Sequence, residues 1–361
     1  MTGPDTAAID PDIQRRRKII AYWLFVMCAM VLIMVVLGGV TRLTHSGLSM
    51  VEWKPATGWL PPLSDAEWED TFEKYRQFPE YKEVNAGMTL SEFKGIFWLE
   101  FLHRLWGRTI GVAFFLPLVW FIAKGWVERG MAPKLIVVFI LGGLQGVLGW
   151  YMVKSGLANQ PDVSQYRLTA HLGAALAIYG YMQWVALGLL FPGAQPGYGP
   201  ASNNLNGFSV ALAVFVFITI LSGGFVAGLD AGFAYNTFPL MDGEMIPAGL
   251  FDMAPIYVNF FENVITVQFD HRILAETLFI GIIVFWWLSR RDTLPPRART
   301  ACNWLVVVAS MQVGLGISTL LLVVPVALAA AHQAGAVVIF SVVLWAAFEM
   351  RLDNTRGKAG T

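Results

Sequence analysis

The sequence is poor in charged residues and contains few cysteines. Only 14% of its 361 residues are Asp, Glu, Lys or Arg, and 25 basic side chains are balanced by 25 acidic ones. Nucleic-acid binding depends on a basic surface, so the zero formal charge argues against a nucleic-acid partner. The two cysteines, Cys28 and Cys302, fall inside hydrophobic segments. They are interpreted as small buried residues and not as a disulfide framework.

Apolar residues dominate the rest of the composition. Hydrophobic side chains make up 56% of the chain, and the mean hydropathy is +0.56, which is too apolar for a water-soluble protein of this size. A bilayer core needs roughly 20 apolar residues in a helix. Runs of that kind lie at about 19–41, 96–123, 134–153, 167–191, 207–229, 264–288, 301–324 and 326–349.

These runs predict an all-α integral membrane protein with eight transmembrane helices. The last two runs are continuous, and we divide them at Pro325 because proline interrupts a helix. The first dozen residues are polar and lack the apolar stretch and cleavage site of a signal peptide. We therefore expect the first span to be retained.

Basic residues cluster in the segments that we assign to the cytoplasm. Four of them precede the first span at 15–18, and Arg351, Arg356 and Lys358 follow the last one. Lys and Arg favour the cytoplasmic side of a membrane, whereas the longer loops on the opposite side are acidic. The sequence predicts a multi-pass protein of the cell inner membrane with both termini in the cytoplasm.

Four features of the first half of the chain recur in the same order in the second half. The matched pairs are Gly38-Gly39 with Gly223-Gly224, His103-Arg104 with His271-Arg272, Gln145 and Gly149 with Gln312 and Gly316, and Ala170-His171 with Ala331-His332. Such duplication is common in membrane proteins. We therefore predict two tandem, pseudo-symmetric four-helix bundles at 19–191 and 207–350, with a cytoplasmic linker at 192–206, an N-terminal segment at 1–18 and a tail at 351–361.

Four of the five histidines occupy equivalent places in this repeat. An imidazole inside a span is costly unless it is bonded or ligating, and four at repeated positions favour ligands over packing residues. Two imidazoles facing each other in a four-helix bundle are the axial ligands of a b-type haem. His103 with His171, and His271 with His332, are therefore expected to bind one haem iron in each half, near the outer face. A zinc site needs a third or fourth close ligand, which neither half offers.

The two halves differ one turn before the first histidine. The first half has Glu100 three residues before His103, and the second half has Gln268 three residues before His271. Residues at that spacing share a helical face, so Glu100 is expected beside the porphyrin edge, where a carboxylate can exchange protons and an amide cannot. The alternative is that Glu100 stabilises the first turn of its helix and pairs with Arg104.

Two arginines and one further histidine remain. Arg104 and Arg272 are interpreted either as partners of haem propionates or as markers of the membrane boundary. His45 lies beyond the first span, and its counterpart in the second half is Asp230. We therefore interpret His45 as a loop residue.

The residues resemble those of a known family. The run 38–49, the Glu100-Phe-Leu-His-Arg104 motif, the Phe269-Asp-His-Arg272 segment and the Ala331-His-Gln333 segment are similar to those of the bacterial and mitochondrial haem A synthases. The resemblance extends over about 19–350. Some bacterial members carry a cysteine pair in an outer loop, and this sequence resembles the branch that lacks it.

The resemblance implies that the chain oxidises the C8 methyl group of haem O to a formyl group by two successive hydroxylations, which gives haem A for cytochrome oxidases. It implies haem b on His271 and His332, the substrate haem at His103 and His171, and a catalytic role for Glu100. The partners compatible with the resemblance are haem O synthase, assembly factors of cytochrome oxidase and a second copy of the chain in a homo-oligomer.

Two alternatives from other classes remain open at this stage. A dihaem cytochrome b that only passes electrons from a quinol to a partner also needs four axial histidines, but it has no use for an acid at one haem and an amide at the other. A haem transporter or chaperone exchanges intact porphyrin and leaves its mass unchanged.

Overall fold

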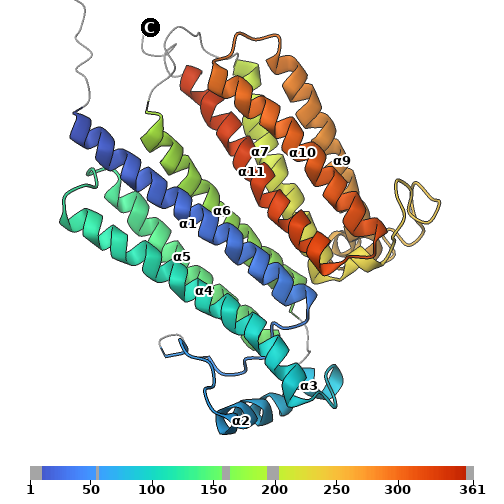
Figure 1. Ribbon diagram of the computed structural model, residues 1–361. Helices are drawn as coiled ribbons and strands as arrows, with labels where there is room; N and C mark the ends of the chain where they lie inside the picture. The colour runs from blue at the N-terminus through green and yellow to red at the C-terminus, as the bar shows by residue number, and fades with distance from the viewer. Residues whose placement is uncertain (1–9, 54–56, 157–162, 193–202, 355–361) are drawn as a thin grey trace, which may run out of the picture.

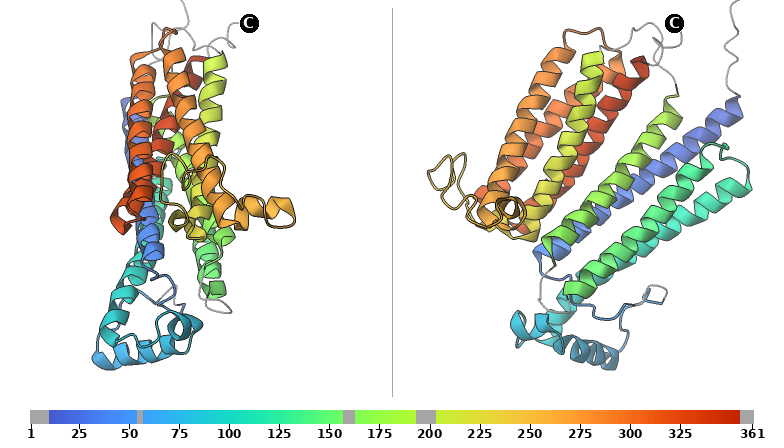
Figure 2. Two further views of the ribbon diagram at one scale, coloured as in Figure 1. Left: turned by 90° about the vertical axis from the view of Figure 1, so that its right-hand side faces the viewer. Right: turned by 180° about the vertical axis from the view of Figure 1, so that it is seen from behind.

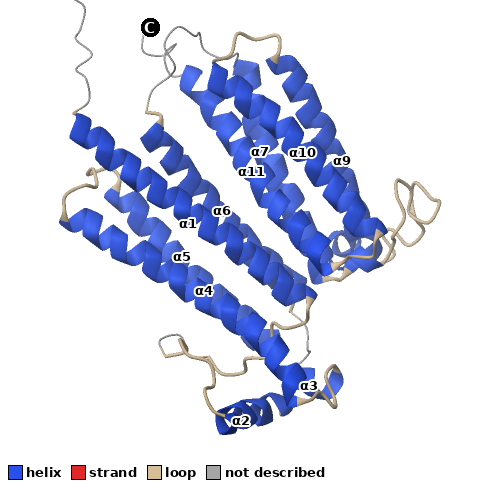
Figure 3. Cartoon of the chain, in the orientation of Figure 1, coloured by secondary structure: helices blue, strands red, loops and turns tan. Residues whose placement is uncertain are grey.

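The part of the chain that the computed structural model describes, residues 10–53, 57–156, 163–192 and 203–354, is mainly helical. Within these ranges there is no strand, only an isolated bridge between Met241 and Glu244 (Figure 3). In the described part of the chain, eight helices are long and apolar enough to cross a membrane. They are α1 (Pro11–Leu43), α4 (Leu90–Ala123), α5 (Ala132–Gly156), α6 (Gln165–Leu190), α7 (Asn203–Gly228), α9 (Val264–Ser289), α10 (Pro296–Leu321) and α11 (Val326–Asn354).

The number and order of the predicted spans are confirmed, but several helices begin earlier than their apolar runs, α1 and α4 by the largest margins. Helix α1 begins where the Asp10 side chain accepts a hydrogen bond from the backbone N–H of Asp12. Helix α4 begins at a capping box in which Thr89 and Glu92 each bind the other's backbone N–H. These polar first turns lie outside the runs that hydropathy detects. The predicted division at Pro325 is confirmed, since α10 ends at Leu321 and α11 begins at Val326.

The eight helices form two groups with the same pattern of neighbours. In the first group α1 packs on α4, α4 on α5, α5 on α6 and α6 on α1. Helices α7, α9, α10 and α11 repeat this pattern in the same order. The groups meet where α1 and α6 face α7 and α11 (Figures 1 and 2). This arrangement agrees with two tandem four-helix units; most of the predicted linker at 192–206 lies outside the described residues.

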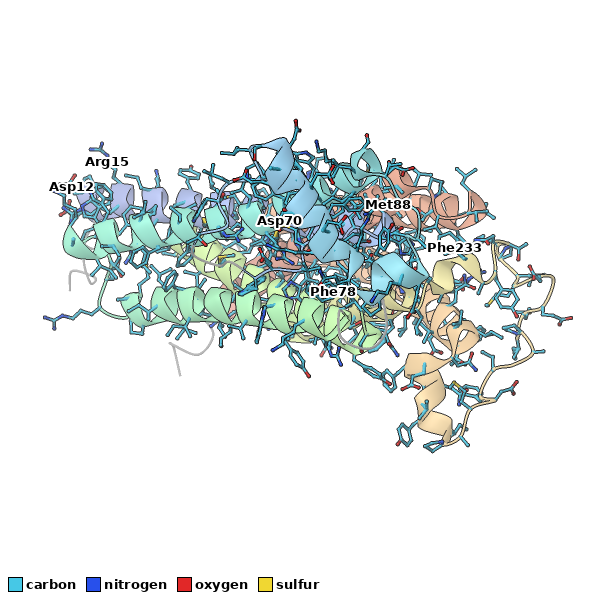
Figure 4. The ribbon with its side chains drawn as sticks, turned by 90° about the horizontal axis from the view of Figure 1, so that it is seen from below. Asp12, Arg15, Asp70, Phe78, Met88 and Phe233 are labelled. Atoms are coloured by element: carbon cyan, nitrogen blue, oxygen red, sulfur yellow. The ribbon has the colours of Figure 1, made fainter. Side chains whose placement is uncertain are left out.

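The two ends of the bundle differ in what covers them. The beginning of α1 and the end of α11 lie at one end, and the long connections after α1 and after α7 lie at the other (Figure 1). Figure 4 shows the molecule from that second end. Asp70, Phe78 and Met88, from the connection after α1, lie over the middle of this view, and Asp12 and Arg15, at the beginning of α1, lie well to one side of them. An even number of spans accounts for the beginning of α1 and the end of α11 lying at the same end.

The connection between α1 and α4 contains two helices that the sequence analysis did not predict. They are α2 (Asp65–Arg76), which begins at a capping box between Ser64 and Glu67, and α3 (Pro79–Glu83). Their apolar face packs on the first turns of α4 in an aromatic cluster. The cluster consists of Trp68, Phe72, Tyr75, Phe93, Phe97 and Phe101. It holds this connection against the helix that carries Glu100 and His103.

The surfaces of the spans are apolar where they face outward. On α5, for example, Ile136, Val137, Ile140 and Leu144 are exposed, as expected of residues that contact lipid. Cys28 and Cys302 are both buried and unpaired, which confirms their interpretation as buried residues.

Candidate functional site

Each of the four helical histidines faces a glycine on the preceding span. The structure places His103 on α4, His171 on α6, His271 on α9 and His332 on α11. A Cβ atom added at the facing glycine would contact the imidazole closely. In the first half it would lie 3.4 Å from His103 Nε2 at Gly38 and 3.2 Å from His171 Cε1 at Gly149. In the second half it would lie 3.1 Å from His271 Cε1 at Gly223 and 2.9 Å from His332 Cε1 at Gly316. The repeated glycines of the sequence therefore provide clearance around the four rings.

The repeated glutamines hold the helices that carry the second histidine of each half. Gln145 Nε2 donates to the backbone carbonyl of His171 at 3.1 Å, and Gln312 Nε2 donates to that of His332 at 2.9 Å. The sequence repeat contained both glutamines but gave them no role. In the structure they fix the rotation of α6 and α11, which determines where each imidazole lies.

The donor set of each half fits a bis-histidine haem. Within the described ranges, no group of three or more His, Cys, Asp or Glu side chains is placed to hold a bare metal ion, so each half offers a pair of imidazoles. All four histidines are half-buried, and the facing glycines carry no side chain that would crowd their rings. The buried Nδ1 of His171 has no hydrogen-bond partner among the described residues. A pair of imidazoles suits a planar group bound through its iron.

Glu100 is buried and accepts hydrogen bonds from three donors. The carboxylate is 2% exposed; its Oε2 accepts from the backbone N–H of Met50 at 2.7 Å and from the Ser49 hydroxyl at 2.8 Å, and its Oε1 accepts from Arg104. The pair with Arg104 that the sequence analysis held open is therefore present. The idea that Glu100 lies in the first turn of its helix is wrong, because α4 begins ten residues earlier, at Leu90.

Gln268 occupies the equivalent place in the second half and makes the opposite kind of contact. Its Nε2 donates to the backbone carbonyl of Tyr235 at 3.0 Å, and its Oε1 lies 3.5 Å from Arg272 Nη2. Both side chains thus brace the connection that follows the first helix of their half. In the first half the carboxylate of Glu100 accepts a hydrogen bond from the connection, and in the second half the amide of Gln268 donates one to it.

The two arginines that follow the first histidines bind the same connections. Arg104 donates to the carbonyls of Met50 and Glu52, at 2.7 and 3.0 Å. Arg272 donates to the carbonyls of Tyr235 and Thr237, at 2.9 and 2.8 Å. Sequence reasoning missed this bracing role, because it depends on the path of the loops. The buried Nε of Arg272 has no partner among the described residues, so a donor remains for an anionic group.

His45 and Asp230 are equivalent turn residues, as the sequence predicts. Both adopt the left-handed conformation directly after a helix, with φ of 49° and 50°, and His45 is exposed. Asp230 accepts a hydrogen bond from Arg42 at 3.1 Å, which links the end of α1 to the end of α7. These turns join the two halves at the end that carries the long connections.

Sequence reasoning also missed a second buried carboxylate, Glu80 on α3. It is 4% exposed, and its Oε2 has no partner among the described residues. Burial and the nearby charge of Glu100 raise the pKa of Glu80 to about 8. The sequence signal was weak, since a glutamate in an acidic outer segment is ordinarily a surface residue.

Known proteins resemble the chain over nearly its whole length. Residues 21–344 match the family COX15-CtaA, described as cytochrome oxidase assembly protein. A protein named Heme A synthase from Nitrosospira multiformis is 58% identical over 93% of this chain and 94% of its own length. Proteins named Heme A synthase COX15 are 47% identical in Bos taurus, over 96% of this chain and 86% of theirs, and 48% identical in Homo sapiens, over 92% and 83%.

Proposed function

The chain belongs to the COX15-CtaA family of cytochrome oxidase assembly proteins, and on that premise we propose that it is a haem A synthase, an enzyme of haem A biosynthesis. The observation that carries the proposal is the 58% identity over 93% of the chain to a protein of that name. The paired histidines of the structure support it. The similarity gives no support to the alternative of a dihaem cytochrome b.

The reaction that we propose is the oxidation of the C8 methyl group of haem O to a formyl group. A first hydroxylation converts one C–H bond to C–OH. A second gives a gem-diol, which loses water to leave the aldehyde. The porphyrin thereby gains one oxygen atom and loses two hydrogen atoms, so the enzyme is an oxidoreductase that acts on a CH3 group.

We assign different tasks to the two halves. His103 and His171 would hold the substrate haem, and His271 and His332 would hold a resident haem b, which when bound supplies one-electron transfer. The carboxylate at position 100 and the amide at position 268 support this division, because only a carboxylate can take up or release a proton. Arg104 and Arg272 would keep the connections in place above the two sites, with the free Nε of Arg272 available to a propionate.

The role that we propose for Glu100 is to accept or deliver protons during the oxidation. Three donors hold its carboxylate, so its position is fixed before substrate arrives. The Met50 backbone and the Ser49 hydroxyl belong to the connection after α1. Movement of that connection would therefore change the position of the acid relative to His103.

The proposal includes a location and partners. The enzyme would lie in the cell inner membrane with both termini in the cytoplasm, which places the long connections and the haem sites near the periplasmic face. It would receive haem O from the haem O synthase and deliver haem A toward cytochrome oxidase and its assembly factors. A homo-oligomer is compatible with the apolar outer faces of the spans.

The test is to weigh the porphyrin. The chain is expressed in a host that makes haem O and no haem A, and the extracted haems are analysed by mass spectrometry. The expected result is haem A in cells with the wild-type chain and only haem O in cells with the His103→Ala variant. A transporter or chaperone would leave the mass of haem O unchanged in both, and that outcome would overturn the proposal.

A further inference from the structure

A serine binds the first histidine of the second half. Ser222 Oγ lies 2.8 Å from Nδ1 of His271, and the same hydroxyl donates its proton to the backbone carbonyl of Thr219 at 2.8 Å. A hydroxyl has a single proton, so Ser222 Oγ must accept the second hydrogen bond, from the Nδ1–H of His271. The imidazole then carries its lone pair on Nε2, the nitrogen that is free to ligate iron.

The first half lacks this contact. Ser222 directly precedes Gly223 in the repeat, and the residue that directly precedes Gly38 is Leu37, which has no polar side-chain atom. No hydrogen bond to the ring of His103 is found among the described residues. Gly38 and Gly223 each face the imidazole of their half, although a Cβ at Gly38 would lie nearest to Nε2 of His103 and a Cβ at Gly223 nearest to Cε1 of His271. The hydroxyl of Ser222 is therefore a polar contact to the imidazole that is described for the second half and not for the first.

We propose that Ser222 is a positioning residue that locks His271 for permanent haem binding, and that Leu37 leaves His103 unrestrained so that haem in the first half exchanges. The inference rests on the proposed function, in which the second half keeps haem b while the first half admits haem O and releases haem A. A ligand site that keeps its metal and one that must release it need different support behind the imidazole. Ser222 provides a hydrogen-bond partner for the imidazole of His271, and Leu37 provides none for the imidazole of His103.

The physical reason is the effect of a hydrogen bond on a ligating imidazole. A bond to Nδ1–H fixes the tautomer and the ring orientation and makes Nε2 a stronger donor, and loss of such a partner typically lowers metal affinity by about 10- to 100-fold. His171 agrees with an unrestrained pair of imidazoles in the first half, because its buried Nδ1 also lacks a partner among the described residues.

The first test measures loss of haem b from the purified holoprotein. Ser222→Ala is expected to accelerate the transfer of haem b to excess apomyoglobin by about 10- to 100-fold and to shift its midpoint potential, whereas Ser222→Thr keeps a hydroxyl and restores both. Ser310→Ala is the matched control, because Ser310 also donates to a carbonyl of its own helix, that of Val306, but is exposed. An unchanged transfer rate and potential in Ser222→Ala would overturn the inference.

The second test moves the hydroxyl to the first half. Leu37→Ser places a hydroxyl three residues after the carbonyl of Met34, as Ser222 stands three residues after Thr219. The variant is expected to keep haem in the first half through purification and to release it more slowly than Leu37→Ala, which opens the same space without a hydroxyl. Equal release from the two variants would contradict the inference even if Ser222→Ala fails to accumulate.

Failure of the proposed function gives a different pattern. If the wild-type chain does not convert haem O but Ser222→Ala still loses haem b faster, the positioning role of Ser222 stands and the enzymatic assignment fails. If conversion is normal while Ser222→Ala and Leu37→Ser behave like their controls, the function stands and this inference fails.

Discussion

The backbone N–H of Met50 donates to the carboxylate of Glu100 across 2.7 Å. This contact ties the acid of α4 to the connection that leaves α1. In the second half the direction is reversed, because Gln268 donates to the carbonyl of Tyr235. Each connection therefore presents the backbone group that matches its own side chain, a donor for the carboxylate and an acceptor for the amide. The difference between the halves extends from one side chain to the loop around it.

Removal of one axial imidazole in the second half should remove the resident haem. His271→Ala and His332→Ala are each expected to abolish most of the low-spin b-type absorbance of the purified protein, because a six-coordinate site needs both ligands. His45→Ala is the control, since His45 is an exposed turn residue. Full haem content with an unchanged spectrum in both variants would show that the second half is not the haem b site.

The orientation in the membrane is open to a direct test with reporter fusions. Reporters fused after residues 75 and 245 are expected to read as periplasmic, and reporters near 130, 200 and 295 as cytoplasmic, as the bias of Lys and Arg requires. The reverse pattern would invert the protein and move both haem sites toward the inner face.

Close packing between α6 and α7 predicts a large effect of a small substitution. A Cβ at Gly228 would lie 2.6 Å from Cα of Gln165, and a backbone atom cannot yield without moving a helix. Gly228→Ala is expected to destabilise the protein by about 1–3 kcal/mol, as overpacking commonly does, and to lower its melting temperature. Gly142→Ala is the control, because a Cβ there meets nothing within 4 Å. Equal melting temperatures for the two variants would argue against the packing of the halves described above.

The buried Glu80 predicts a dependence of stability on pH. Its pKa in the folded state is about 8, above the ordinary value of 4.5, so the unfolded chain releases a proton that the folded chain keeps. Stability should therefore fall as pH rises from about 4.5 to about 8, by up to about 1.4 kcal/mol per pH unit, and level off above that.

The substitution Glu80→Gln should remove this dependence and stabilise the connection between α1 and α4 above neutral pH. The control is Glu83→Gln, on the same helix and exposed. Thermal unfolding followed at several pH values, with tryptophan fluorescence as the probe, measures both variants. If Glu80→Gln and the wild type lose stability in parallel over this range, Glu80 is not a buried neutral acid.

The spans and the paired histidines could be predicted because both depend on local pattern. Apolar runs of membrane length identify helices without knowledge of their neighbours, and duplication repeats the places of His103 and His271. Helix α2 also had a local signal, the capping box of Ser64 and Glu67 before apolar residues spaced for one helical face. The composition of that segment nevertheless predicts an acidic loop, because its charged residues outnumber its apolar ones.

The contacts around the site depend on loops and therefore could not be predicted from local pattern. The binding of Glu100 by Met50 and Ser49 joins residues about 50 positions apart. The role of Ser222 depends on which nitrogen of His271 its hydroxyl meets. In the sequence the residue appears only as one of several differences between the repeats. Burial of Glu80 likewise depends on the path of the connection between α1 and α4, which brings Glu80 near Glu100.

Glu100→Gln distinguishes a part for Glu100 in the oxidation of haem O in the first half from a purely structural role. The amide keeps an acceptor for Arg104 but turns a donor toward Met50 N–H. A lost backbone hydrogen bond costs about 1–3 kcal/mol, so the variant is expected to fold and to keep haem b. Ser49 can redirect its hydroxyl to the carbonyl of Ser46, which lies 3.0 Å away.

The measurement is the mass profile of haems extracted from cells that make haem O and express Glu100→Gln, normalised to the haem b that the purified variant retains. The account predicts a fall in the yield of haem A by about 100- to 10,000-fold, the usual effect of losing a general acid or base, with the hydroxymethyl intermediate accumulating beside unreacted haem O. A normal yield of haem A would contradict it and would leave Glu100 as a structural partner of Arg104 and Met50.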